Sequence, residues 1–336
     1  MVGSSRAALR RREEEARARR DRLVLLGTIG VLAVTAVIVL VGVYLTVYRP
    51  PRTVVATIDG RAVPAAEVVD RATFFMVFEG GAFSTRPDDD VAEPGVDRLV
   101  RDAVLLRDAP TLVEPVTSED IDAKIQEALG AALDADALKK ARDEVLERAG
   151  ITITQYRQIM EARILAERLT ERFRGELPAA LPQRHLERVR TPSQVNAERV
   201  IERGRAGEPF TALAVQYGAD RRNEVDQGWL VEEMLLPETR VAVEALSAGE
   251  ISGISVNGLF FDVYRVVEVD EARELSEEQK GLVAERRVER WIEDQEALLG
   301  VVRNLSATSS EWITQRVTAR VRDAFAAQAA KAKAKR

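Results

Sequence analysis

The longest uninterrupted apolar stretch of the chain is residues 23–48, LVLLGTIGVLAVTAVIVLVGVYLTVY, which contains no charged residue. A helix rises about 1.5 Å per residue, so a helix over this stretch exceeds the ~30 Å hydrocarbon core of a bilayer. The stretch is longer than the apolar region of a signal peptide, and it lacks the polar face of a helix in a globular core. We therefore expect one membrane-spanning helix over residues 23–48.

The charges on either side of this stretch predict its orientation. Residues 1–22 are polar and rich in arginine, whereas Tyr44, Tyr48 and Arg49 stand at the other end of the apolar run, where interfacial anchors are found. Because cytoplasmic flanks carry the excess of Lys and Arg, we expect residues 1–22 to be a cytoplasmic tail. The rest of the chain after Arg49 is then extracytoplasmic, and the protein is a single-pass protein of the cell membrane.

The next part of the chain alternates a short strand pattern with helical patterns. Residues 54–58 predict a strand that ends at an Asp59-Gly60 turn, and Pro64 suits the first turn of a helix. Helical periodicity follows at residues 96–108, 118–129, 136–148 and 154–173, and residues 79–95 have the composition of a flexible acidic loop. An N-cap at Thr117 and a stop at Gly150 define two of the boundaries. In the last of these helices the apolar positions form one stripe: Tyr156, Ile159, Met160, Ile164 and Leu165.

The C-terminal half predicts a second, mixed module. A short strand over residues 184–190 precedes helical segments, and a β pair closes on residues 259–269. Two further helices follow, each opened by a capping-box pattern, Ser276 with Gln279 and Thr308 with Glu311. In the last helix the apolar residues recur every fourth position: Ile313, Val317, Val321 and Phe325. The fold class is therefore α+β.

Composition limits the chemistry that the chain can carry. The chain has 336 residues, 46% of them hydrophobic and 31% charged, which is typical of a globular, helix-rich protein of about two domains. It contains no cysteine and one histidine, so we expect no disulfide, no metal site and no cofactor. A net charge of −6 does not favour nucleic acid as a partner.

Four sequence blocks, in order, give the C-terminal module a family resemblance. They are Arg184-His185-Leu186; then Gly207, Phe210, Leu213-Ala214, Tyr217 and Asp220; then Asp226 and Gly228-Trp229; and last Ala245-Leu246 with Gly249-Glu250-Ile251-Ser252. This set resembles the parvulin (PpiC-type) peptidyl-prolyl cis-trans isomerases. The resemblance implies a βαααββ domain over residues 181–270 that acts on prolyl peptide bonds.

The preceding part, residues 51–178, resembles the helical chaperone region of the membrane-anchored foldases of the SurA, PrsA and PpiD type. The resemblance is carried by VVATIDGRAV, LVRDAVLLRDA, VTSEDIDAKIQEAL and GITITQYRQIMEARILAERL. In such proteins a helix after the isomerase domain can return to the chaperone domain, and we assign that part to residues 272–303, the helix with Trp291. Residues 306–336 then form an amphipathic helix with a basic tail.

The parvulin resemblance also implies the site residues. Rotation about a peptide bond has a barrier of about 18–20 kcal/mol, and an isomerase lowers it with an apolar pocket for proline and polar groups that favour the twisted amide. The family's first histidine and its loop Asp correspond to His185 and Asp220, and its second histidine is replaced by Asp262. The implied substrate-binding positions are Met234, Leu235, Thr239 and Phe260.

Each of these assignments has a structural alternative. His185 can serve only the fold, with Asp262 as the partner to test; Asp220 can be a loop or capping residue; and Trp229 is expected to pack behind the pocket. A Ser-His-Asp hydrolase would need His185 but lacks a G-x-S-x-G elbow. The sequence thus predicts an extracytoplasmic foldase with prolyl isomerase activity on unfolded, proline-containing polypeptides. The alternative is a catalytically inactive holdase that binds unfolded polypeptides, and the oligomeric state stays open.

Overall fold

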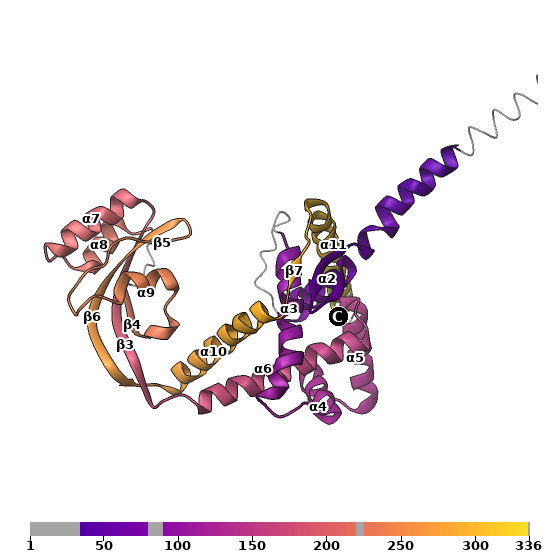
Figure 1. The fold of residues 1–336 in the computed structure, drawn as a ribbon, viewed down its shortest axis with the longest axis horizontal. Coiled ribbons are helices and arrows are strands. Elements are labelled where there is room, and N and C mark those ends of the chain that lie inside the picture. Colours follow the sequence, from indigo (N-terminus) through magenta and orange to yellow (C-terminus); the bar gives the residue numbers. More distant parts are fainter. Residues whose placement is uncertain (1–33, 80–89, 220–224, 335–336) are drawn as a thin grey trace, which may run out of the picture. The chain divides into compact units, whose positions relative to one another are not determined.

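The computed structural model describes residues 34–79, 90–219 and 225–334 (Figure 1). The chain divides into two compact units, Met1–Arg101 with Ala132–Tyr156 and Leu299–Arg336, and Asp102–Ala131 with Arg157–Leu298. The structure is a mixture of helices and sheets, as the sequence predicts. The helices α3 (Ala92–Asp108) and α6 (Ile153–Gly175) each contribute residues to both units.

The expected membrane-spanning segment is only partly described. Residues 34–43 are helical with exposed apolar side chains and continue into η1 (Tyr44–Tyr48) and η2 (Pro50–Arg52), whereas residues 23–33 lie outside the described residues. Within the described part of the chain, no helix is both long enough and apolar enough to span a bilayer.

The first unit contains a small sheet with strand order β2-β1-β7. The hairpin of β1 (Val54–Ile58) and β2 (Arg61–Pro64) turns at Asp59 and Gly60, whose φ values of 50° and 74° fit the tight turn expected from the sequence. Pro64 ends β2 and serves as the N-cap of α2 (Ala65–Phe78), so it stands one residue before the helix rather than inside it. The third strand, β7 (Val302–Arg303), was not expected from the sequence.

Helix α3 begins earlier than predicted, at Ala92, so the C-terminal end of the expected loop over residues 79–95 is helical. The Asp90 carboxylate accepts a hydrogen bond from the Ala92 N–H at 2.8 Å and opens the helix. Pro94 is tolerated because it lies in the first turn. Gly95 is needed because a Cβ atom there would lie 2.8 Å from the Val68 side chain of α2. Residues that resemble helix breakers therefore serve the start of α3.

The chain returns to the first unit through β7 and α11 (Ala307–Ala334), whereas α10 (Glu277–Leu298), the helix with Trp291, belongs to the second unit. Of residues 272–303, to which the sequence assigned the return, the structure places only Leu299–Arg303 in the first unit. Helix α11 packs on α2 and α5 (Ala135–Ala149), and Arg320 on α11 pairs with Asp70 on α2 at 2.6 Å.

Two details of α11 also differ from the prediction. Its capping residues are Ser306 and Ser309, because the helix starts two positions before the predicted Thr308 box. Its buried stripe runs through Ile313, Val317 and Ala324, and Phe325 is half-exposed, because a repeat of 3.6 residues drifts away from a spacing of four.

Helices α4 (Ser118–Leu129), α5 and α6 begin and end near the predicted boundaries. Helix α4 opens with a capping box of Thr117 and Asp120, and Gly150 ends α5 in the left-handed conformation. Arg168 on α6 donates to the Asp120 carboxylate at 2.9 Å and to the Glu114 carbonyl at 2.8 Å, which fixes the segment before α4. The connecting 3-10 turn is η3 (Ala109–Thr111).

The C-terminal part of the second unit is a four-stranded antiparallel sheet with order β4-β3-β6-β5 (Figure 1). Its elements, in order, are β3 (Ala180–Thr191), α7 (Gln194–Arg205), α8 (Phe210–Tyr217), β4 (Asp226–Val231), η4 (Glu232–Met234), α9 (Pro237–Val243), β5 (Ser255–Asn257) and β6 (Phe260–Glu274). This order is βααβαββ and differs from the expected βαααββ, because the segment with Gly228 and Trp229 forms a strand.

The two faces of this sheet carry separate cores. Val189 and Val263 pack with residues of α7 and α8, chiefly Phe210 and Leu213, on one face. On the other face Leu186, Tyr264 and Val266 pack with Leu235 and with Val243 of α9. Helices α7 and α8 thus cover one side of the sheet, and α9 covers part of the other (Figure 1).

Candidate functional site

A buried ion pair lies on the α9 face of the sheet. The strand register places Arg190 of β3 opposite Asp262 of β6. The Arg190 guanidinium donates two hydrogen bonds to the Asp262 carboxylate, at 2.8 and 2.9 Å. Asp262 is fully buried, whereas the Arg190 side chain keeps 28% of its exposure. A buried carboxylate is tolerated here because a bidentate cation neutralises it.

Two buried hydroxyl groups extend this pair toward α9. The Tyr264 phenol donates to Asp262 at 3.4 Å, and the Thr239 hydroxyl on α9 lies 3.1 Å from the Tyr264 oxygen. Burial and the Asp262 charge raise the pKa of Tyr264, so its hydroxyl keeps its proton. Arg190, Asp262, Tyr264 and Thr239 form one connected chain of polar contacts, called the polar network below. It joins β3, β6 and α9.

The predicted pairing of His185 with Asp262 is wrong. Successive side chains of a strand point to opposite faces, and His185 and Arg190 are five residues apart on β3. The β-bulges in this sheet lie in β4 and β6, so β3 itself alternates regularly. His185 and the Arg190–Asp262 pair therefore project from opposite faces of the sheet. Register, which decides the partners, is set by the whole sheet and not by the motif.

His185 pairs with a different motif residue, Asp226 at the start of β4. The His185 Nε2 atom lies 2.7 Å from the Asp226 carboxylate, which also accepts the Gly228 N–H at 2.8 Å. The bonds from His185 and Gly228 lower the pKa of Asp226. The Trp229 ring lies 5.6 Å from the His185 ring, and the Arg273 guanidinium covers it at 4.0 Å. Trp229 thus packs against His185, and the R-H-L and D-x-G-W blocks meet in this cluster.

The predicted substrate-binding residues fall into separate places. Leu235 and Thr239 are buried: Leu235 belongs to the apolar cluster that contains Tyr264, and the Thr239 hydroxyl lies 3.1 Å from the Tyr264 oxygen. Phe260 is 38% exposed and lies beside the polar network, with the Arg190 guanidinium 5.4 Å from its ring. Met234 packs elsewhere, in a cluster with Val231. The structure therefore groups Leu235, Thr239, Phe260 and Asp262, and leaves out Met234 and His185.

Asp220 lies outside the described residues, but the chain on both sides of residues 220–224 is attached to β3. The Ala219 N–H donates to the Arg190 carbonyl and the Arg188 N–H donates to the Val225 carbonyl, both at 2.8 Å. The segment that contains Asp220 therefore begins and ends next to the strand that carries Arg190.

The G-E-I-S block, Gly249 to Ser252, is hydrogen-bonded to β6, the strand that carries Asp262 and Tyr264 of the polar network. The buried Ser252 hydroxyl accepts the Tyr264 N–H at 2.9 Å, and the Gly249 N–H donates to the Val266 carbonyl at 2.7 Å. Gly249 has φ of 89°, a conformation that side chains disfavour. The sequence reasoning missed Arg190 and Tyr264 as members of the network. The signal for Arg190 was an arginine directly after the buried Val189, which becomes informative only once the register is known.

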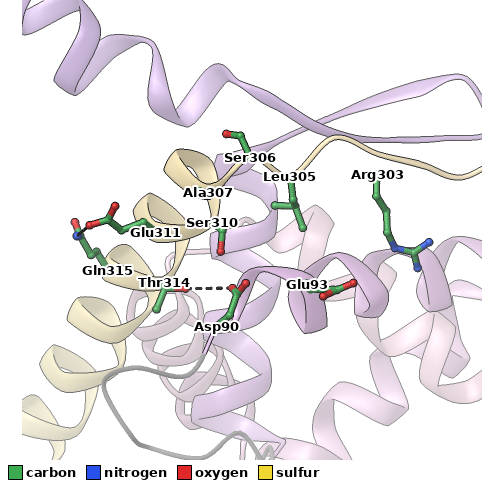
Figure 2. Close-up of a pocket in the computed structure, with 10 residues that line it drawn as sticks. All are labelled: Asp90, Glu93, Arg303, Leu305, Ser306, Ala307, Ser310, Glu311, Thr314 and Gln315. Atoms are coloured by element: carbon green, nitrogen blue, oxygen red, sulfur yellow. Dashed lines mark hydrogen bonds between the residues drawn. The ribbon is translucent and has the colours of Figure 1, made fainter.

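The first unit contains a separate open pocket of about 830 Å³ at the N-terminal ends of α3 and α11 (Figure 2). Carboxylates and hydroxyls line it, and the Thr314 hydroxyl lies 3.5 Å from Asp90 (Figure 2). No group of three or more potential metal ligands occurs among the described residues. The lining residues are Asp90, Glu93, Arg303, Leu305, Ser306, Ala307, Ser310, Glu311, Thr314 and Gln315.

No family model matches the chain, and no curated protein matches it. Among solved structures, the peptidylprolyl isomerase PrsA from Bacillus anthracis is 14% identical, over 68% of this chain and 97% of that chain, with a TM-score of 0.39. PrsA from Bacillus cereus is 14% identical, over 82% and 98% of the two chains, with a TM-score of 0.35. A SurA-like chaperone from Campylobacter jejuni is 14% identical, over 74% and 96%, with a TM-score of 0.27. Similarity at this level assigns neither an activity nor a site to this chain.

Proposed function

We propose that this chain is a membrane-anchored extracytoplasmic foldase whose four-stranded sheet domain isomerises prolyl bonds in unfolded polypeptides. The observation that carries this proposal is the polar network from Arg190 through Asp262 and Tyr264 to Thr239. It contains Asp262, the residue at the position of the family's second histidine, whereas His185, at the position of the first, lies on the other face of the sheet.

The physical role of this network is to keep the site rigid. Isomerisation requires no nucleophile and no cofactor, only a surface that binds the twisted amide better than the planar one. The network ties α9 to β3 and β6 with buried hydrogen bonds, so that Leu235 and Thr239 stay fixed on the sheet face that also carries the exposed Phe260 ring. Leu235, Thr239 and Phe260 are called the apolar edge below. The proline ring would contact this apolar edge, and Asp220, which the parvulin resemblance assigns to the site, would supply a charge.

A second candidate is a holdase that binds unfolded polypeptides without catalysis. The observation in its favour is that Asp262 is fully buried and already neutralised by Arg190, so it presents no charge to a substrate. His185 is engaged with Asp226 on the other face of the sheet. In this case the apolar edge binds clients, and isomerisation does not exceed the uncatalysed rate.

One pair of assays separates the two candidates, using the full chain in detergent micelles. The first follows cis–trans isomerisation of a proline tetrapeptide, and the second follows suppression of aggregation of a denatured client protein. The foldase predicts catalysis that Tyr264→Phe lowers several-fold, because the link between Asp262 and Thr239 is lost. Tyr217→Phe is the matched control, since this phenol bonds Arg203 at 2.9 Å on the other side of the sheet. Suppression of aggregation without isomerisation would refute the foldase and support the holdase.

The proposed anchor is residues 23–48, with residues 1–22 in the cytoplasm. The support is the uncharged apolar run and the excess of arginine before it. Protease added to sealed spheroplasts should degrade the region after Arg49. Protection of that region in sealed spheroplasts, with degradation after lysis, would show the opposite orientation.

A further inference from the structure

We propose that Arg188 binds a carboxylate of the client, so that the sheet domain prefers segments with Asp or Glu beside the proline. This inference rests on the proposed binding of unfolded polypeptide at the α9 face. It adds the chemical class of segment that the face selects.

Three arginines of β3 face α9, because residues 184, 188 and 190 have the same parity on a strand without bulges of its own. Arg184 is saturated: it pairs with Glu232 and donates to the Leu246 and Glu244 carbonyls at 2.6 and 2.9 Å. Arg190 is paired with Asp262. Both therefore hold parts of the domain together.

Arg188 lies between them and is different. It stands opposite Tyr264 in the sheet, and its Nε atom is buried without a hydrogen-bond partner. No carboxylate pairs with its guanidinium in the part of the chain that the structure describes. A buried donor without an acceptor is costly, and most such groups in native proteins have partners. A carboxylate on the accessible part of the guanidinium would neutralise its charge, while the Nε atom itself stays enclosed.

The charge balance of this face points to the same ligand. Arg188 and Arg190 carry two positive charges, and Asp262 offsets only one of them. The Arg188 side chain is half-buried, so a bound segment can still reach it. Guanidinium groups recognise carboxylates through paired hydrogen bonds. An acidic side chain next to the proline would place such a carboxylate there while the proline contacts the apolar edge.

The test measures binding, which does not depend on catalysis. Two dye-labelled, C-terminally amidated peptides differ only in Glu or Gln before the proline, and their affinities for the full chain are measured by fluorescence anisotropy. The Glu peptide should bind about fivefold more tightly at low salt, which corresponds to ~1 kcal/mol for one partly exposed charge pair. The preference should shrink as salt is added. A third peptide, with Gln and a free C-terminus, shows whether a terminal carboxylate can replace the side chain.

The variants assign the preference to one residue. Arg188→Gln should bring the Glu-to-Gln affinity ratio to about one, and Arg188→Lys should keep part of it, because the charge stays while the paired geometry is lost. Arg199→Gln is the matched control: it removes one exposed positive charge from α7, which covers the other face of the sheet, and should leave the ratio unchanged.

A Glu-to-Gln affinity ratio of about one for wild type would overturn the proposal. So would a loss of preference in Arg199→Gln as large as in Arg188→Gln, because that would mean a general charge effect. If the chain shows the preference but no isomerisation, the role of Arg188 stands and the enzymatic function fails. If it isomerises both peptides and binds them equally, the enzymatic function stands and the role of Arg188 fails.

Discussion

The ion pair between Arg190 and Asp262 predicts an unequal response to the loss of each partner. Asp262 is fully buried, and its remaining polar contacts, Tyr264 at 3.4 Å and Asn257 at 3.5 Å, are long. Arg190→Met would leave the carboxylate buried without its cation, which typically costs about 3–5 kcal/mol. Asp262→Asn keeps the volume and one acceptor, and the partly exposed Arg190 can be hydrated instead. We expect this variant to cost about 1–2 kcal/mol.

The double variant tests whether the cost comes from the unpaired charge. Replacing a buried ion pair by apolar residues of similar size is often neutral or stabilising. Arg190→Met combined with Asp262→Leu should therefore be less destabilised than Arg190→Met alone, by at least about 2 kcal/mol. Equal costs for the two single variants, or additive costs in the double variant, would refute the reasoning.

The assay has to report on this sheet alone, because a chain of two units need not unfold in one step. Hydrogen exchange of the β3 and β6 amides under native conditions gives the free energy of opening for these strands. Urea unfolding of the same proteins, followed by tryptophan fluorescence, gives the global value. Arg190→Met should lower the free energy of opening measured at the β3 and β6 amides and leave that of the α2 amides, in the other unit, unchanged.

Two further predictions follow from other ion pairs. His185→Ala should lower the melting temperature only slightly, because its partner Asp226 is 68% exposed and can be hydrated; a loss as large as that of Arg190→Met would contradict this. Burial raises the pKa of Asp70 above 3.8, with Arg320 and Gln155 opposing the shift. The folded state therefore holds that proton more tightly, and the stability that Asp70 contributes decreases as pH rises through its folded pKa. In unfolding experiments at about pH 3 and pH 6, the free energy of unfolding of wild type minus that of Asp70→Asn should be larger at about pH 3.

Most of the secondary structure was predictable from local signals. The start of α4 at the Thr117 capping box, the end of α5 at Gly150 and the turn at Asp59 and Gly60 each depend on a few neighbouring residues. Where local signals were ambiguous, the prediction was wrong. A proline and a glycine near the start of α3 resembled a loop, and the glycine proved to be needed for close packing against α2.

The partners within the candidate site were not predictable in this way. The motifs identified Asp262 and His185 correctly as residues of the two long strands, but a strand's side chains alternate between faces. Only the register reveals that Asp262 lies opposite Arg190 and that His185 meets Asp226. The two-residue strand β7 is defined by its antiparallel pairing with β1, so residues 302 and 303 carried no strand signal of their own in the sequence.

The domain boundary gives the last prediction. The sequence pattern favours residues 181–270 as the independent domain, yet this range omits Leu275 and Val283, which are buried against Val231. Burying two such side chains contributes about 3–5 kcal/mol, a large share of the 5–15 kcal/mol typical of a domain. A fragment of residues 176–298, which keeps α10, should therefore show a cooperative urea transition at a clearly higher midpoint than the fragment 181–270. Equal midpoints would mean that α10 does not belong to the sheet domain. A higher midpoint for fragment 176–298 would show that the domain extends beyond the last parvulin-like motif. The motif residues lie around the candidate site, whereas the domain boundary depends on the buried core.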